Sequence, residues 1–267
     1  ALVCSIGAVI CYMLCYHMTT ERVKVEQNTQ KFSFKELISE IAHNKALIGI
    51  IVCALLFLLA QLSLSNMNNY IYPNYFGNVS AMSLANLAGM VVILVLSTFI
   101  VKLSAKVGKK ELSVIGSIIS AAAFLILFFI HTDNVWVWIV LVLISSVGTA
   151  MFNMVIWAMI TDVIDDSEVR TGVRQDGTIY SVYSFARKLG QACSSGISGV
   201  LLSIIGYTAA TAHDPKVVDG IYNVTCLVPA LGMILLFLAL QFLYPLNKKR
   251  VEENAKILKE RREAKVQ

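Results

Sequence analysis

Residues 112–160 read LSVIGSIISAAAFLILFFIHTDNVWVWIVLVLISSVGTAMFNMVIWAMI and decide the fold class of this 267-residue chain. Two apolar runs flank the polar sequence HTDN, and each is long enough, at about 20 residues or more, to cross a bilayer as a helix. A lipid-exposed backbone must satisfy its own hydrogen bonds, and neither run alternates like a barrel strand. The stretch therefore predicts two antiparallel transmembrane helices.

The whole chain has the same character. Hydrophobic residues make up 57% of it and charged residues 15%, with a mean hydropathy of +0.70. A soluble domain carries about a quarter charged residues, so a soluble enzyme, a nucleic-acid binder and a secreted disulfide scaffold are excluded. The net charge of +5 does not favour a nucleic-acid partner, because Lys and Arg lie mainly between the apolar runs. We predict an all-α polytopic membrane protein.

The apolar runs divide the chain into four parts. Residues 1–18 are apolar without a preceding basic region, so we interpret them as the end of a transmembrane helix rather than a signal peptide. Residues 46–246 form a six-helix bundle, and residues 247–267 form a charged tail, helical or disordered. The six spans are predicted at 46–72, 82–101, 112–131, 135–160, 178–207 and 220–244.

The fourth part, residues 19–45, is a linker between residues 1–18 and the six-helix bundle. Its apolar residues are spaced as in a short amphipathic helix that lies on a membrane surface. These residues are Phe32, Phe34, Leu37, Ile38 and Ile41.

Lys and Arg predict the orientation of the spans. Residues 19–45 hold five of them, 102–110 hold four, the acidic loop 161–177 holds two and the tail holds eight. The loops that alternate with these segments along the chain, and so lie on the other side of the membrane, together hold only Lys216. Because cytoplasmic loops are enriched in these residues, we expect the linker and the tail to be cytoplasmic. The protein would then lie in a plasma membrane, such as a bacterial inner membrane.

The span at 178–207 carries polar residues within an apolar helix. A cation inside a membrane span is costly and indicates a functional site. Lys188 lies about 15 Å along a helix that begins near Thr178, close to the bilayer centre. A later start, near Phe185, would instead let Arg187 and Lys188 reach the inner interface. A polar stripe at helical spacing accompanies Lys188: Ser181, Ser184, Gln191 and Ser195.

The preceding span has its own polar stripe, formed by Thr149, Asn153, Trp157 and Thr161. A tryptophan face flanked by amide and hydroxyl groups suits a sugar, whose CH face stacks on an aromatic ring. Trp157 is also compatible with an interfacial anchor. In the first complete span, four amides have two interpretations, a substrate path or a helix end before Pro73: Gln61, Asn66, Asn68 and Asn69.

Three segments together carry a family resemblance: DVIDDSEVRTGVRQDG (162–177), YSVYSFARKLGQ (180–191) and GVLLSIIGY (199–207). They resemble the glycoside–pentoside–hexuronide:cation symporters of the major facilitator superfamily. The resemblance implies the C-terminal half of a twelve-helix transporter, together with the end of helix six. It also implies that Lys188 and Ser184 face the substrate. The family's tryptophan in the preceding helix is replaced here by Asn153, with Trp157 one turn later.

The resemblance further implies a cytoplasmic gate made of carboxylates and arginines, which here are Asp162, Asp165, Glu168, Arg170 and Arg174. The coupling cation, Na⁺ or H⁺, would bind mainly in an N-terminal half that partners this chain. We expect no other cofactor. We also expect no metal site, because the six cysteines lie in apolar runs without ligand spacing.

We therefore predict a secondary active transporter rather than an enzyme, which moves a sugar, glycoside or hexuronide by alternating access. The predicted substrate-binding residues are Thr149, Asn153, Trp157, Ser184, Arg187, Lys188 and Gln191. A Na⁺-coupled lysolipid carrier of the same fold is one alternative, and a receptor or sensor without transport is another. The polar stripes favour a hydroxylated solute over a lipid.

Overall fold

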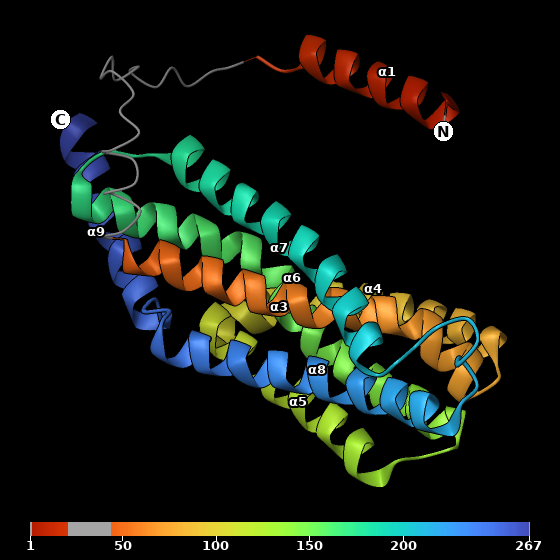
Figure 1. The fold of residues 1–267 in the computed structure, drawn as a ribbon. Helices are drawn as coiled ribbons and strands as arrows, with labels where there is room; N and C mark the ends of the chain where they lie inside the picture. The colour runs from red at the N-terminus through yellow and green to blue at the C-terminus, as the bar shows by residue number, and fades with distance from the viewer. Residues whose placement is uncertain (1, 21–43, 267) are drawn as a thin grey trace. The chain divides into compact units, whose positions relative to one another are not determined.

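The computed structural model describes residues 2–20 and 44–266, and every regular element among them is helical (Figure 1). The chain divides into two compact units, residues 1–38 and 39–267. The first unit contains α1 (Leu2–Met18), an apolar helix. The predicted amphipathic helix of the linker falls at positions outside the described residues.

The second unit is a helical bundle. Its elements are α3 (Lys45–Tyr70), η1 (Ile71–Tyr75), α4 (Val79–Val107), α5 (Lys109–Ile130), α6 (Val135–Thr171), α7 (Asp176–Ile204), α8 (Pro215–Phe242) and α9 (Lys248–Val266). The π-helix η1 continues α3 past the predicted end and through Pro73. The tail is helical, as α9.

Polar residues between the apolar runs begin these helices. The side-chain oxygens of Asn44, Asn78 and Asn134 each accept a hydrogen bond from a backbone N–H in the first turn of α3, α4 and α6. Asp214 does the same for α8, which has Pro215 in its first turn. These are the residue types that stabilise helix N-termini, so the helix starts follow from local chemistry.

The predicted acidic loop at 161–177 is wrong. Helix α6 has 37 residues and continues through the acidic cluster to Thr171. It ends only at Gly172, whose φ of 76° lies in the left-handed region and whose N–H donates to the Glu168 carbonyl. No proline or glycine lies between residues 161 and 171, so nothing stops the helix earlier. The cluster is therefore held on a rigid helix face.

The number of apolar spans differs from the prediction. Five helices of the described chain are long and apolar enough to cross a membrane: the continuous α3–η1 helix, α4, α5, α6 and α8. Helix α7, predicted as a sixth span, has sufficient length at 29 residues but is too polar. Its composition marks it as a helix that needs a polar environment on one side.

Close helix packing builds the bundle. Helix α3 packs on α7 and α8, α5 on α6 and α8, and α4 on α6 (Figure 1). At the α5–α6 crossing, Gly116 and Gly148 face each other so closely that a Cβ on either would meet the carbonyl oxygen of the other. Beside them the buried hydroxyls of Ser120 and Ser145 hydrogen bond at 2.7 Å. Small residues thus set the distance between these helices.

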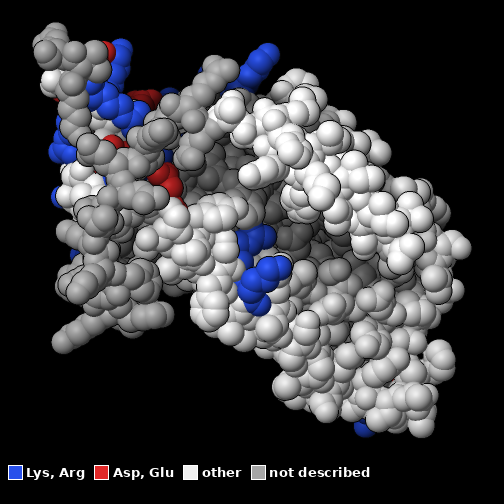
Figure 2. All heavy atoms as spheres, turned by 90° about the horizontal axis from the view of Figure 1, so that it is seen from above, with Lys and Arg blue, Asp and Glu red and all other residues white. Residues whose placement is uncertain are grey.

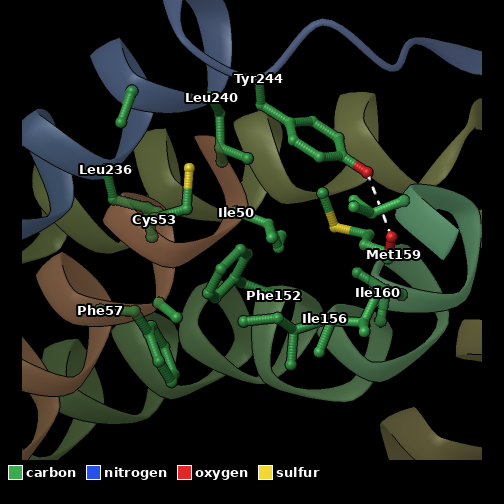
Figure 3. Packing of buried hydrophobic residues seen from close by; sticks show 14 of the residues in the cluster. Ile50, Cys53, Phe57, Phe152, Ile156, Met159, Ile160, Leu236, Leu240 and Tyr244 are labelled. Carbon is green, nitrogen blue, oxygen red and sulfur yellow. Dashed lines mark hydrogen bonds between the residues drawn. The ribbon is translucent and has the colours of Figure 1, made fainter. Parts of the chain in front are cut away.

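Two apolar clusters fill the bundle. One lies between α3, α6 and α8 and includes Phe57, which packs against Phe152 with ring centroids 4.9 Å apart (Figure 3). In this cluster the Tyr244 hydroxyl donates to the Met159 carbonyl at 3.4 Å. The second cluster surrounds Trp138 and Tyr222 near the opposite end of the bundle. Together they fix the axes of α3 and α6, which carry the polar residues described next.

One end of the bundle is rich in charge. This is the end of the bundle where α3 and α7 begin, α6 ends and α9 packs, and we call it the charged end. Figure 2 shows blue and red side chains gathered at one end of the face in view, a smaller blue patch near its middle, and mostly uncharged side chains elsewhere. An apolar body with charges at its end is the surface that a bilayer requires.

Candidate functional site

A cation and three aromatic rings meet where α6 lies beside α7. The Arg187 guanidinium carbon lies 4.9 Å from the centroid of the Trp157 ring and 5.8 Å from that of Tyr183. Tyr180 and Tyr183 each lie 5.8 Å from Trp157, centroid to centroid. We call these four residues the cation–aromatic cluster. Arg187 is therefore held over a ring that remains 44% exposed.

Lys188 lies on the outward side of α7 next to this cluster. Helix α7 packs against α3 through Gly190 and through a hydrogen bond of 3.0 Å from the Asn66 amide to the Ser198 hydroxyl. Lys188 is exposed, while Ser184 and Gln191 are half-buried. The polar stripe thus lies on the open side of α7, about 18 Å along the helix from Asp176.

The stripe on α6 divides between two places. Trp157 belongs to the cation–aromatic cluster, and Asn153 is exposed one turn away. Thr149 instead lines a cavity of about 310 Å³ between α3, α4 and α6, about 12 Å from Trp157 along the helix. The predicted substrate residues therefore do not form one compact pocket within this chain.

The four amides of α3 have different surroundings. Gln61 and Asn68 line the cavity, so the substrate-path interpretation stays a prediction for these two. Asn66 bonds to α7, and the Asn69 amide donates to the carbonyls of Ser65 and Asn66 in its own helix. None of them caps the helix end before Pro73, because η1 continues through it.

Arg174 organises the acidic residues at the charged end. Its Nη1 donates to Asp165 and Glu168 at 2.9 Å each, and its Nε donates to Asp176 at 2.7 Å. Burial lowers the pKa of the guanidinium, but the bonds to three carboxylates outweigh this and raise the pKa above its ordinary value. Arg174 therefore stays charged and ties the end of α6 to the start of α7.

The other predicted gate residues have separate partners. The buried carboxylate of Asp162 accepts from Lys109 at 2.6 Å, and Arg170 pairs with Asp166 at 3.2 Å. Asp166 also accepts from the buried Asn254 amide of α9 at 3.0 Å. The predicted gate thus consists of three ion-pair groups with an added buried contact to the tail.

The sequence analysis missed the partners of these carboxylates. Lys109 belongs to the KVGKK sequence, which was counted only as a positive loop. Three further partners come from the tail: Asn254, Arg261 and Arg262. Arg261 donates to the backbone carbonyl of Glu168 at 3.3 Å, and Arg262 pairs with the Glu168 carboxylate at 3.6 Å. An acidic helix end facing a basic tail was the available signal, but its pairing required the fold.

Comparisons with known proteins agree with this architecture. The family described as MFS/sugar transport protein matches residues 1–248. An uncharacterized symporter of Bacillus subtilis, YjmB, is 31% identical over 88% of this chain and 51% of its own length. A glucuronide carrier protein homolog of Escherichia coli is 30% identical over 94% and 55%. An isoprimeverose transporter of Lactiplantibacillus pentosus is 25% identical over 96% and 55%.

The chain spans about half the length of these relatives. The match confirms the resemblance carried by the segments 162–177, 180–191 and 199–207, and it confirms an all-α polytopic membrane fold. Since the family profile covers nearly the whole chain, the chain belongs to the MFS/sugar transport protein family.

Proposed function

We propose that this chain is part of a Na⁺- or H⁺-coupled symporter for a sugar or glycoside, and that it supplies the C-terminal half. The cation–aromatic cluster carries the proposal. A transporter of this family that places an arginine over an exposed tryptophan, next to a lysine, has the groups that sugar recognition needs. The ring of Trp157 offers an apolar face to sugar CH groups, and the two cations donate hydrogen bonds to oxygens.

The relatives support a substrate with an acidic group. One is named as a glucuronide carrier homolog and another as a putative sulfoquinovose importer. A carboxylate or sulfonate would bind Arg187 through paired hydrogen bonds, which a guanidinium forms better than an ammonium. We propose that Arg187 binds such a group and that Lys188 contacts the ring hydroxyls or the coupling site of the partner half.

The charged end is proposed as the cytoplasmic gate. Arg174 and its three carboxylates would keep α6 and α7 together as one moving body, while the second half of the transporter rocks against them. The substrate would then reach the cluster from alternate sides of the membrane. No covalent chemistry is required of this chain.

The test is uptake by the full-length protein in proteoliposomes, under imposed Na⁺ or H⁺ gradients, with glucuronate, methyl glucuronide, xylose and isoprimeverose as solutes. We expect gradient-driven accumulation of at least one of them. Lys188→Ala and Arg187→Gln should each weaken uptake, with an apparent affinity lower by about 10- to 100-fold, because each removes a charged hydrogen bond.

Lys216→Ala is the matched control, since Lys216 is an exposed cation in the first turn of α8. It should leave uptake unchanged. Saturable binding without accumulation would contradict the symporter in favour of a receptor. Accumulation of lysophospholipid but of no sugar would replace the substrate class.

A further inference from the structure

The cavity between α3, α4 and α6 is lined by uncharged polar groups. Gln61, Ser65 and Asn68 come from α3, Asn86 comes from α4, and Ser146 and Thr149 come from α6. Its volume of about 310 Å³ lies at the lower end of the range for small-molecule sites. We name it the amide cavity.

Its amides lack partners. The Asn68 side-chain oxygen is buried and has no hydrogen-bond partner. Gln61 and Asn86 are exposed, and within the described part of the chain they make no side-chain hydrogen bond, although both belong to membrane-spanning helices. A polar group at such depth is costly unless it meets water, protein or a ligand. Three unpaired amides around one space indicate a ligand with several hydroxyl groups.

Apolar residues also line the cavity. They include Phe124, Val142, Pro229 and Met233. A space lined by both amide groups and an aromatic and aliphatic surface suits a sugar ring, which has hydroxyl edges and CH faces. No Lys, Arg, Asp or Glu lines the amide cavity, so its chemistry selects a neutral ring rather than an acidic one.

Helix α6 connects the amide cavity to the cation–aromatic cluster. Thr149 lines the first and Trp157 belongs to the second, with exposed Asn153 between them on the same helix side. Their separation along α6 is about 12 Å. One sugar ring covers only part of this distance, whereas two linked rings reach both ends.

We propose that the amide cavity is a second subsite, which binds the neutral ring of a two-ring glycoside whose other ring lies at the cation–aromatic cluster. This proposal rests on the proposed sugar transport. It adds a preference for the length of the substrate: a disaccharide, or another glycoside with two sugar rings, should bind more tightly than either of its single rings.

The test compares isoprimeverose with its component xylose and with glucuronate, a single acidic ring expected at the cation–aromatic cluster, by isothermal titration of the full-length protein in detergent. Gln61→Ala, Asn86→Ala and Gly89→Leu are the variants. Gly89 lines the cavity and a Cβ there meets no atom within 4 Å, so a leucine fills the space without a clash at its Cβ. Each variant should weaken isoprimeverose binding by about tenfold or more and leave glucuronate binding unchanged, because an acidic ring belongs at the cation–aromatic cluster.

Asn69→Ala is the matched control, because the Asn69 amide bonds to its own helix and lies outside the cavity lining. Thermal melting of each variant checks that it remains folded. Equal losses for isoprimeverose and glucuronate, or no loss for either, would overturn the subsite but not sugar transport. A folded wild-type protein that binds neither these sugars nor glucuronate and methyl glucuronide would overturn both proposals.

Discussion

Asp162 is a carboxylate in an apolar setting, and one lysine neutralises it. Its side chain is 7% exposed and that of Lys109, 2.6 Å away, is 31% exposed. The two partners therefore differ in what happens when the other is removed. A lysine without its carboxylate can turn to solvent, whereas the buried carboxylate has no such route.

We predict that Lys109→Ala destabilises the bundle more than Asp162→Asn does. The expected cost of Lys109→Ala is about 2 kcal/mol, below the usual range for a fully buried pair because Lys109 is partly exposed. Adding Asp162→Asn to Lys109→Ala should restore most of this loss. The melting temperatures of the three variants in detergent give the order of their stabilities.

Lys102→Ala serves as the control, since Lys102 is an exposed lysine of the same region. It should melt with the wild type. Identical melting of Lys109→Ala and Lys102→Ala would contradict a structural role for the buried pair.

At the scale of elements, α6 is the axis on which the functional groups are placed. It carries Thr149 at the amide cavity, Trp157 at the cation–aromatic cluster and the acidic residues at the charged end. Its position depends on the close contact with α5 at Gly148, which lies one residue from Thr149. Packing on one side of α6 therefore sets the geometry of its polar side.

Gly148→Ala should separate α5 from α6 and lower stability by about 1–3 kcal/mol, the usual cost of overpacking. The added Cβ would meet the Gly116 carbonyl oxygen and the backbone nitrogen of Ser120. Detergent melting curves give the change. Gly196→Ala, where a Cβ meets no atom within 4 Å, is the matched substitution and should not destabilise. Equal melting temperatures for the two variants would show that the close contact is unimportant.

At the scale of the molecule, the distribution of charge predicts how the bundle lies in the membrane. Nineteen of the 22 Lys and Arg residues fall in the linker, in residues 102–110 and 161–177, and in the tail, all on one predicted side. Helix α9 contributes eight of these within residues 247–267 and packs against the end of α6. The charged end is therefore predicted to be cytoplasmic.

Cysteine labelling tests this orientation. In a cysteine-free background, Ala210→Cys lies in the exposed segment between α7 and α8, and Lys259→Cys lies on the exposed side of α9. A membrane-impermeant maleimide added to intact cells should label position 210 and leave position 259 unlabelled until the cells are opened. The reverse pattern would invert the topology and move the gate to the outside.

The sequence alone determined the membrane helices and the family. Apolar runs such as 112–131 have one stable form in a bilayer, and an asparagine before a helix caps it through contacts only three residues away. Segment-level signals also sufficed to identify Lys188 and Trp157 as candidates. The loop prediction at 161–177 failed because an acidic composition does not end a helix, whereas Gly172 does.

The tertiary structure decided which side chains meet. Lys109 and Asp162 are 53 positions apart, Asp166 and Asn254 are 88 apart, and the amide cavity joins residues of α3, α4, α5, α6 and α8. Spacing along one helix cannot reveal such partners, because they depend on how neighbouring helices pack. Arg187 illustrates this: its direction around α7 was undetermined until the fold placed it over Trp157. Close packing at Gly116, Gly148 and Gly190 sets the distances between neighbouring helices, and this packing is a property of helix pairs.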